Sequence, residues 1–213
     1  MMLIKLRESL PKSSIALGAT LADKHMQPVH DAAAESSIAP GSLVLLDFKG
    51  ITGVNGSYIR GTALWVFMCG QLFANPSQVL SPPRHRADPR PYDLYVCVAG
   101  LSSEVKAEFL EFLKPRRLPL LFASKYRGDV VTEAELLGHL DPSLTKTLQA
   151  ATQRGTVTAP ELHKAFPDQQ ITVTAWNNRL NDLHGLRLLR RSQAGRVWKY
   201  ESLAKKILWE SHS

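Results

Sequence analysis

The chain has 213 residues, of which 44% are hydrophobic and 8% aromatic, and it carries a formal net charge of +7. This length allows one large domain or two small ones with buried cores, and the composition excludes a disordered or fibrous protein. No stretch of about 18 apolar residues occurs, which excludes a membrane-spanning helix. The first residues, MMLIKLRE, lack the long apolar segment of a signal peptide.

The two cysteines, Cys69 and Cys97, both have apolar neighbours. Such cysteines are typical of buried thiols in a reduced cytoplasmic protein. Their spacing does not fit a zinc site and no His/Cys ligand set is clustered, so we expect neither a metal ion nor another cofactor. The sequence also lacks a phosphate-binding loop, a serine-hydrolase elbow and a metalloprotease motif, so we expect a protein that is not an enzyme.

Positive charge is concentrated near the C-terminus. Residues 143–213 contain 11 Lys and Arg against 5 Asp and Glu, so they carry +6 of the total charge. This asymmetry is typical of a polyanion-binding module joined to a nearly neutral one. A solvated basic face would give the same pattern.

Strands alternate with helices through the first two thirds of the sequence. Residues 20–36 predict a helix that Pro28 should kink or divide. Apolar runs at residues 42–50, 93–100 and 118–124 have the length and composition of buried strands, and helical patterns at 58–73 and 102–117 separate them. Residues 1–17 could add a strand or two at the edge. We therefore expect a small βαβ-type α/β domain with a largely parallel sheet in residues 1–140.

The segment NPSQVLSPPRHRADPRPYD, about residues 75–93, is rich in proline and arginine. Such a segment cannot form a core element. It is either a solvated loop or an interaction surface, since long loops in compact domains are often functional.

The stretch LVLLDFKGITGVNGSYIRG, residues 43–61, resembles the signature region of STAS domains, the family of anti-sigma-factor antagonists. In that family a strand with an acidic end leads to a Ser-containing turn that begins a helix, and a kinase-like partner phosphorylates one hydroxyl of the turn. The resemblance implies that Ser57 is the matching position, with Asn55 and Asp47 beside it as further regulatory residues. Asn55 and Gly56 stand where the family has Asp and Ser.

The residues alone leave two alternatives open at this site. The residues favour a plain N-cap role for Ser57 after an Asn-Gly turn, although a phosphate there would meet the favourable end of the helix dipole. Asp47, at the end of its strand, could either hold the following loop or face a ligand.

The last third of the chain, residues 141–213, predicts three helices followed by a hairpin. The first spans 144–154 and ends at Gly155, the second spans 159–166 with Thr158 as its cap, and the third begins after Thr172 or Thr174. In the third helix Trp176, Leu180 and Leu183 form one apolar stripe, and Gly185 ends it. LRLLRR and RVWKY predict two strands joined at SQAG, and residues 202–209 predict a final helix.

This order resembles the winged helix-turn-helix DNA-binding domains of prokaryotic transcriptional regulators. The matching features are T-x-x-E-L at residues 158–162, R-L-x-x-L at 179–183, G-L at 185–186, and a basic hairpin. The resemblance implies double-stranded DNA as partner. A winged helix can also serve as a protein-interaction module, and that alternative stays open.

Asn and Arg are the side chains that pair bidentately with adenine and guanine edges, and arginines of a wing reach phosphates or the minor groove. The candidate contacts on the third helix are Thr174, Asn177, Asn178, Arg179 and Asn181. The candidate backbone contacts on the hairpin are Arg190, Arg191, Arg196 and Lys199.

The sequence therefore favours a cytoplasmic, prokaryotic DNA-binding regulator in which the STAS-like domain senses, dimerises or recruits. A homodimer is expected, because one winged helix often needs a second copy for affinity. One alternative is a signalling adaptor whose STAS-like domain binds a histidine-kinase-like ATPase. Another is a DNA-binding regulator that senses a small molecule through its α/β domain.

Overall fold

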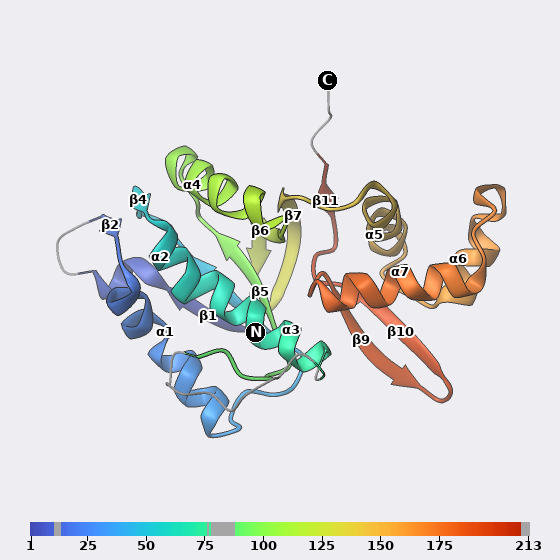
Figure 1. Cartoon of the computed structure of the whole chain (residues 1–213), viewed down its shortest axis with the longest axis horizontal. Coiled ribbons are helices and arrows are strands. Elements are labelled where there is room, and N and C mark those ends of the chain that lie inside the picture. The colour runs from blue at the N-terminus through green and yellow to red at the C-terminus, as the bar shows by residue number, and fades with distance from the viewer. Residues whose placement is uncertain (11–13, 76, 78–87, 210–213) are drawn as a thin grey trace.

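The computed structural model describes residues 1–10, 14–75, 77 and 88–209. Within them, a six-stranded sheet has the order β1-β3-β5-β6-β7-β11 (Figure 1). The strands are β1 (Met2–Lys5), β3 (Ser42–Asp47), β5 (Leu94–Ala99), β6 (Pro119–Arg127), β7 (Val130–Gly138) and β11 (Ile207–Leu208). β1, β3, β5 and β6 are parallel, β7 is antiparallel to β6, and β11 is parallel to β7. The prediction of an α/β protein with a mainly parallel sheet is confirmed.

Helices cover one face of the sheet (Figure 1). They are α1 (Ala19–Ala34), α2 (Gly56–Ile59) continuing through a π-helical turn (Arg60–Leu64) into α3 (Trp65–Ala74), and α4 (Ser103–Leu113). α1 runs through Pro28 as one helix, so it is not divided there. Short elements complete this part: β2 (Ile15–Ala16) pairs with β4 (Gly53–Val54), and single 3-10 turns span Leu6–Ser9 and Lys114–Arg116.

The opposite face of the sheet packs against the C-terminal third of the chain. Side chains alternate along β3, so Val44 and Leu46 join the core under the helices, whereas Leu43 and Leu45 face the other way. These two leucines share a second core with Trp176, Leu180 and Leu183. This arrangement explains why β3 and β5 are buried on both faces.

The C-terminal third contains α5 (Pro142–Arg154), β8 (Thr156–Val157), α6 (Ala159–Ala165), α7 (Val173–Gly185), β9 (Leu189–Ala194) and β10 (Val197–Ser202). A 3-10 turn (Pro167–Gln169) lies between α6 and α7. β8, β10 and β9 form a three-stranded antiparallel sheet in that order. The predicted cap of α6 is confirmed, with Thr158 and Glu161 forming a reciprocal capping box, and of the two predicted caps of α7 the structure has Thr172.

One prediction for this part of the fold is wrong, and one strand of the large sheet was not predicted. Residues 202–209 do not form a helix. Instead β11 crosses back to the large sheet, where Ile207 and Leu208 pair with Ala134 and Glu135 of β7. β7 was not predicted, although its charged and apolar residues alternate and it follows directly on β6 through a tight turn at Gly128. β11 was not predicted because long-range pairing with β7 stabilises it, and local patterns do not reveal such pairing.

Of the loop predicted at about residues 75–93, residues 76 and 78–87 lie outside the described part of the chain. Near its end, the backbone N–H of Arg90 donates to the Sγ of Cys69, 3.4 Å away. No helix in the described ranges is long and apolar enough to cross a membrane.

Candidate nucleic-acid interface

α7 is held by its apolar stripe and exposes the opposite side. Trp176, Leu180 and Leu183 are fully buried, and the ring of Phe166 lies 6.1 Å from that of Trp176. Successive helical residues are about 100° apart around the axis, so Thr174 and Asn178 lie opposite the stripe. Both are exposed, as expected for residues available to a partner.

The other predicted contacts of α7 differ in position. Asn177 is half-buried on the flank between Thr174 and the core. Arg179 lies on another flank, also half-buried, with its guanidinium 5.9 Å from the ring of Trp176. α7 therefore presents a hydrogen-bonding side that also carries the exposed Asp182 one turn after Asn178, and Arg179 is not grouped with Thr174 and Asn178.

Asn181 joins α7 to the β9–β10 hairpin. Its Oδ1 accepts hydrogen bonds from the hydroxyl of Tyr200, at 2.6 Å, and from Nη1 of Arg191, at 3.2 Å. The Asn181 carbonyl is therefore occupied within the chain. Its position fixes the hairpin beside the exposed side of α7, and sequence reasoning had placed it among the DNA contacts.

The register of the hairpin defines its two faces. Tyr200 pairs with Arg191, and Trp198 pairs with Gln193. Because side chains alternate along a strand, these four residues lie on one face with Leu189 and Ser202, which we call the α7-side face. The guanidinium of Arg191 stacks 4.3 Å from the centre of the Trp198 ring. The opposite face carries Arg190, Ser192, Ala194, Val197, Lys199 and Glu201.

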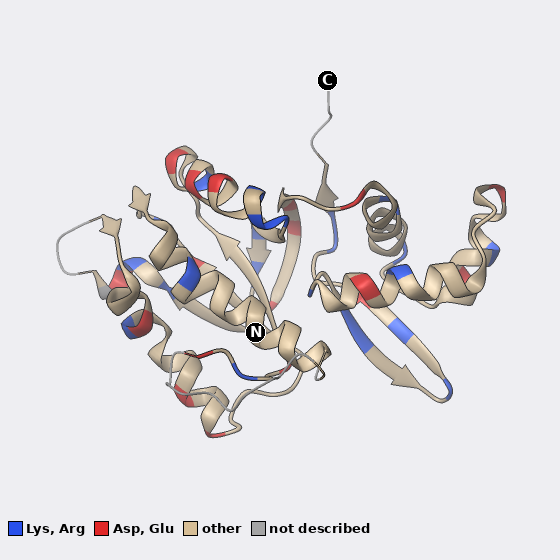
Figure 2. Cartoon of the chain, in the orientation of Figure 1, with Lys and Arg blue, Asp and Glu red and all other residues tan. Residues whose placement is uncertain are grey.

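Two predicted backbone contacts therefore lie away from α7. Lys199 is exposed on the opposite face. Arg190 lies on that face too, and its Nε donates to the carbonyl oxygen of Gly41, 3.1 Å away in the α/β region. Arg196 is exposed at the tip next to Gly195, whose φ of 64° the turn requires. Figure 2 shows basic residues along both hairpin strands and at this tip.

A buried ionic contact fixes the end of α7 on the large sheet. Arg187 is 2% exposed, and its Nε donates to the carbonyl oxygen of Leu94, at 3.0 Å. Its Nη2 forms an ion pair with Asp93, and its guanidinium lies 3.7 Å from the centre of the Tyr95 ring. This contact joins the start of β5 to the segment between α7 and β9.

His184 adds to the same junction. Its Nδ1 lies 3.2 Å from the carbonyl oxygen of Leu189 and 3.3 Å from the Tyr95 hydroxyl. Burial lowers the pKa of His184 to about 4, and the charge of Arg187 acts in the same direction. The imidazole is therefore neutral at physiological pH and serves as a structural hydrogen-bonding group.

The residues of the STAS-like resemblance have separate structural roles. Asn55 is the N-cap of α2, and its Oδ1 accepts from the backbone N–H groups of Tyr58, at 3.0 Å, and Gly18, at 3.1 Å. Ser57 is exposed in the first turn, so it is not the N-cap. Asp47 accepts from the backbone N–H of Lys49, at 2.9 Å, and from the Tyr126 hydroxyl, at 3.1 Å. Of the two alternatives for Asp47, the structure supports the loop-holding role.

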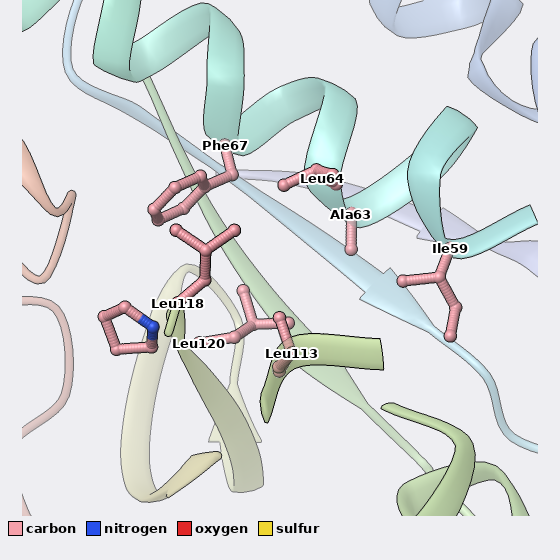
Figure 3. Close-up of a pocket in the computed structure, with 8 residues that line it drawn as sticks. Ile59, Ala63, Leu64, Phe67, Leu113, Leu118 and Leu120 are labelled. Carbon is pink, nitrogen blue, oxygen red and sulfur yellow. The ribbon is translucent and has the colours of Figure 1, made fainter. Parts of the chain in front are cut away.

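The hollows that the described residues form outside this interface include a small cavity and a larger groove. A cavity of about 10 Å³ is lined by apolar side chains of the α2–α3 segment and by Leu113, Leu118, Pro119 and Leu120 (Figure 3). It is no larger than one water molecule needs, so it is a packing gap. A groove of about 480 Å³ lies between the edge of β7, the end of α5 and residues 201–205. Its charged lining residues are Asp129, Arg154, Arg190, Glu201 and Lys205.

No protein-family model, curated protein or solved structure matches the chain. In the described ranges, no three His, Cys, Asp or Glu residues are grouped so that they could hold a metal ion.

Proposed function

We propose that the protein is a DNA-binding transcriptional regulator in which residues 142–202 form a winged helix-turn-helix domain. α5, α6 and α7 are its three helices, β8, β10 and β9 its sheet, and the β9–β10 hairpin its wing. The observation that carries the proposal is the joint contact of Tyr200 and Arg191 with Asn181. It places a basic hairpin beside the exposed, hydrogen-bonding side of α7.

In this proposal α7 enters the major groove of duplex DNA. Thr174, Asn177 and Asn178 contact base edges or phosphates, because short amide side chains can pair with adenine. Arg191 and Arg196 contact phosphates near the adjacent groove. Asn181, Arg190 and Lys199 have no place in this interface, since the Oδ1 of Asn181 is occupied within the chain and the other two residues lie on the opposite face of the hairpin.

The α/β region is proposed to sense, dimerise or recruit a partner in the cytoplasm. A homodimer would present two copies of α7 to two half-sites, as in other helix-turn-helix proteins. The large shared core supports a rigid link between this region and the DNA-binding elements. A change in the α/β region would then act on DNA binding through the position of α7 as a whole.

A fluorescence-anisotropy titration tests the proposal. The purified protein is titrated against a duplex from the DNA upstream of its own coding sequence and against a scrambled duplex, at about 50 and about 200 mM salt. If Arg191 and Arg196 of two copies make four phosphate contacts, affinity falls roughly 100-fold between these concentrations. Weak binding to both duplexes without this salt dependence would overturn the proposal.

The exposed position of Ser57 favours one alternative, a signalling adaptor whose STAS-like region binds a histidine-kinase-like ATPase. In that case the hairpin serves protein contacts, and the same titration finds no specific binding to DNA. The adaptor would instead co-elute with its ATPase, and Ser57→Asp would change that complex while leaving the fold unaltered.

The groove beside α5 favours a second alternative, a DNA-binding regulator that senses a small polar molecule. Its volume suits a metabolite, and its lining comes from both the α/β region and the C-terminal third. A thermal-shift screen would reveal such a ligand, because a molecule at about 100 times its Kd stabilises the protein by roughly 2.7 kcal/mol. Arg154→Ala would abolish the shift if the groove is the site.

A further inference from the structure

Trp198 is the large aromatic residue that the hairpin leaves exposed. Its side chain is 39% exposed, whereas Tyr200, two residues further along the same face, is fully buried. The orientation of the ring is restricted, because Arg191 stacks on it and donates a hydrogen bond to Asn181 of α7. Arg191 therefore covers one side of the Trp198 ring, and part of the residue, 39% of its surface, is exposed to solvent.

The surroundings of Trp198 suit a polyanion. The α7-side face of the hairpin contains Leu189, Arg191, Gln193, Trp198, Tyr200 and Ser202, so it carries a positive charge and no acidic residue. Arg196 adds a second cation at the tip. Glu201, the acidic residue of the hairpin, lies on the opposite face. A nucleic acid fits this surface better than an apolar protein surface does, because it offers negative phosphates to the cations and flat bases and sugars to the aromatic ring.

Trp198 also lies on the side of the hairpin that faces α7. Tyr200 and Arg191, on the same face, both reach Asn181. A duplex that rests on Thr174 and Asn178 therefore meets the α7-side face of the hairpin next. An indole ring at this position would contact the apolar surface of deoxyribose and the edges of the bases.

We propose that Trp198 packs on the sugars and base edges of the groove next to the one that α7 occupies, with Arg191 stacked behind it. This inference rests on the proposed function and adds a contact of a different kind to it. Phosphate contacts release counterions and are weakened by salt, whereas an apolar contact with sugar or base is not. The wing thus contributes an attachment to DNA that persists at high ionic strength.

Salt titrations of Trp198→Ala test the inference, with Val197→Ala as the matched control. Val197 is the neighbouring exposed apolar residue, 43% exposed, on the opposite face of the hairpin. We expect Trp198→Ala to lower DNA affinity roughly tenfold at every salt concentration and to leave the log–log salt slope unchanged. Val197→Ala should bind as the wild type does, and Trp198→Phe, which keeps a ring, should retain most of the affinity.

Two results would overturn the inference while leaving the proposed function in place. In one, the wild type binds DNA in a salt-dependent way and Trp198→Ala binds equally well. In the other, Trp198→Ala flattens the salt slope by about one contact for each copy bound, as Arg191→Ala should, which would mean that the ring only positions Arg191. If the wild type binds no duplex specifically, the proposed function fails and this inference fails with it. Quenching of tryptophan fluorescence by DNA, compared between the wild type and Trp198→Phe, checks the contact in folded protein.

Discussion

Arg187, which is buried, and Asp93, which is partly exposed, form an ion pair that joins the end of α7 to the start of β5. Arg187 has a φ of 56°, an uncommon conformation for a residue other than glycine, and its side chain is enclosed by Leu94 and Tyr95. A charged residue in this setting is costly to bury unless its partners are all in place. The pair therefore fixes where the proposed DNA-reading helix stands on the α/β region.

Arg187→Ala should lower the free energy of unfolding by about 2–3 kcal/mol, because it removes a buried side chain and leaves the partly exposed Asp93 without its opposite charge. Asp93→Asn should have a similar effect. Urea denaturation of both variants and of the double variant measures their coupling, and we expect the double variant to lose less than the sum of the two. Strictly additive losses would show that the two side chains do not stabilise each other.

Gly70→Ala should destabilise the same junction. A Cβ at Gly70 would lie 2.2 Å from the carbonyl oxygen of Leu94 and 2.7 Å from Nε of Arg187, so backbone and a buried side chain would have to shift. We expect a loss of about 1–3 kcal/mol. Gly185→Ala is the matched control, because a Cβ there has no neighbour closer than 3.6 Å. Equal stability of the two variants would contradict the close packing at Gly70.

Trp176→Ala should destabilise the protein by about 3–5 kcal/mol, because it removes a fully buried ring from the core shared by α7 and the sheet. Chemical denaturation followed by circular dichroism measures the loss. A variant that kept full stability and lost only DNA binding would show that Trp176 faces the duplex and that α7 is turned the other way.

Stability should fall as the pH drops from about 6.5 toward 4. Burial lowers the pKa of His184 from 6.5 to about 4, so the unfolded chain binds a proton in this range that the folded chain does not. The contribution is complete above pH 6.5, and about 2 kcal/mol of it is lost between pH 7 and pH 5. His25, whose pKa burial also lowers, acts in the same direction. His184→Gln should therefore reduce the difference in unfolding free energy between the two pH values. An unchanged difference would contradict the role of His184.

Local signals in the sequence predicted much of the C-terminal third. Thr158 and Thr172 are hydroxyl residues that precede apolar stripes, and both cap their helices. Gly195 lies in the hairpin turn. The buried strands β3 and β5 were equally clear, because both are continuous apolar runs. These features depend on residues close together in the chain.

Long-range contacts were not predictable in the same way. Arg187 and Arg190 resemble the other arginines of a basic segment, yet one is buried against Asp93 and the other reaches Gly41. Which face of the hairpin carries Lys199 depends on the register between β9 and β10, and the predicted strands did not fix it. The alternation in RVWKY does place Trp198 on the same face of the strand as Tyr200, and that signal could have identified the exposed tryptophan.

The comparison of Arg191→Ala with Lys199→Ala tests the central claim most directly. Both variants remove one positive charge from the same hairpin, but Arg191 lies on the α7-side face and Lys199 on the opposite one. Anisotropy titrations at several salt concentrations should show that Arg191→Ala weakens binding to duplex DNA and reduces the log–log salt slope by about 0.9 for each copy bound, or about 1.8 for a homodimer, whereas Lys199→Ala changes neither by much. Equal effects of the two variants, or no effect of either on a salt-dependent interaction, would contradict a DNA interface formed by α7 and this face of the hairpin.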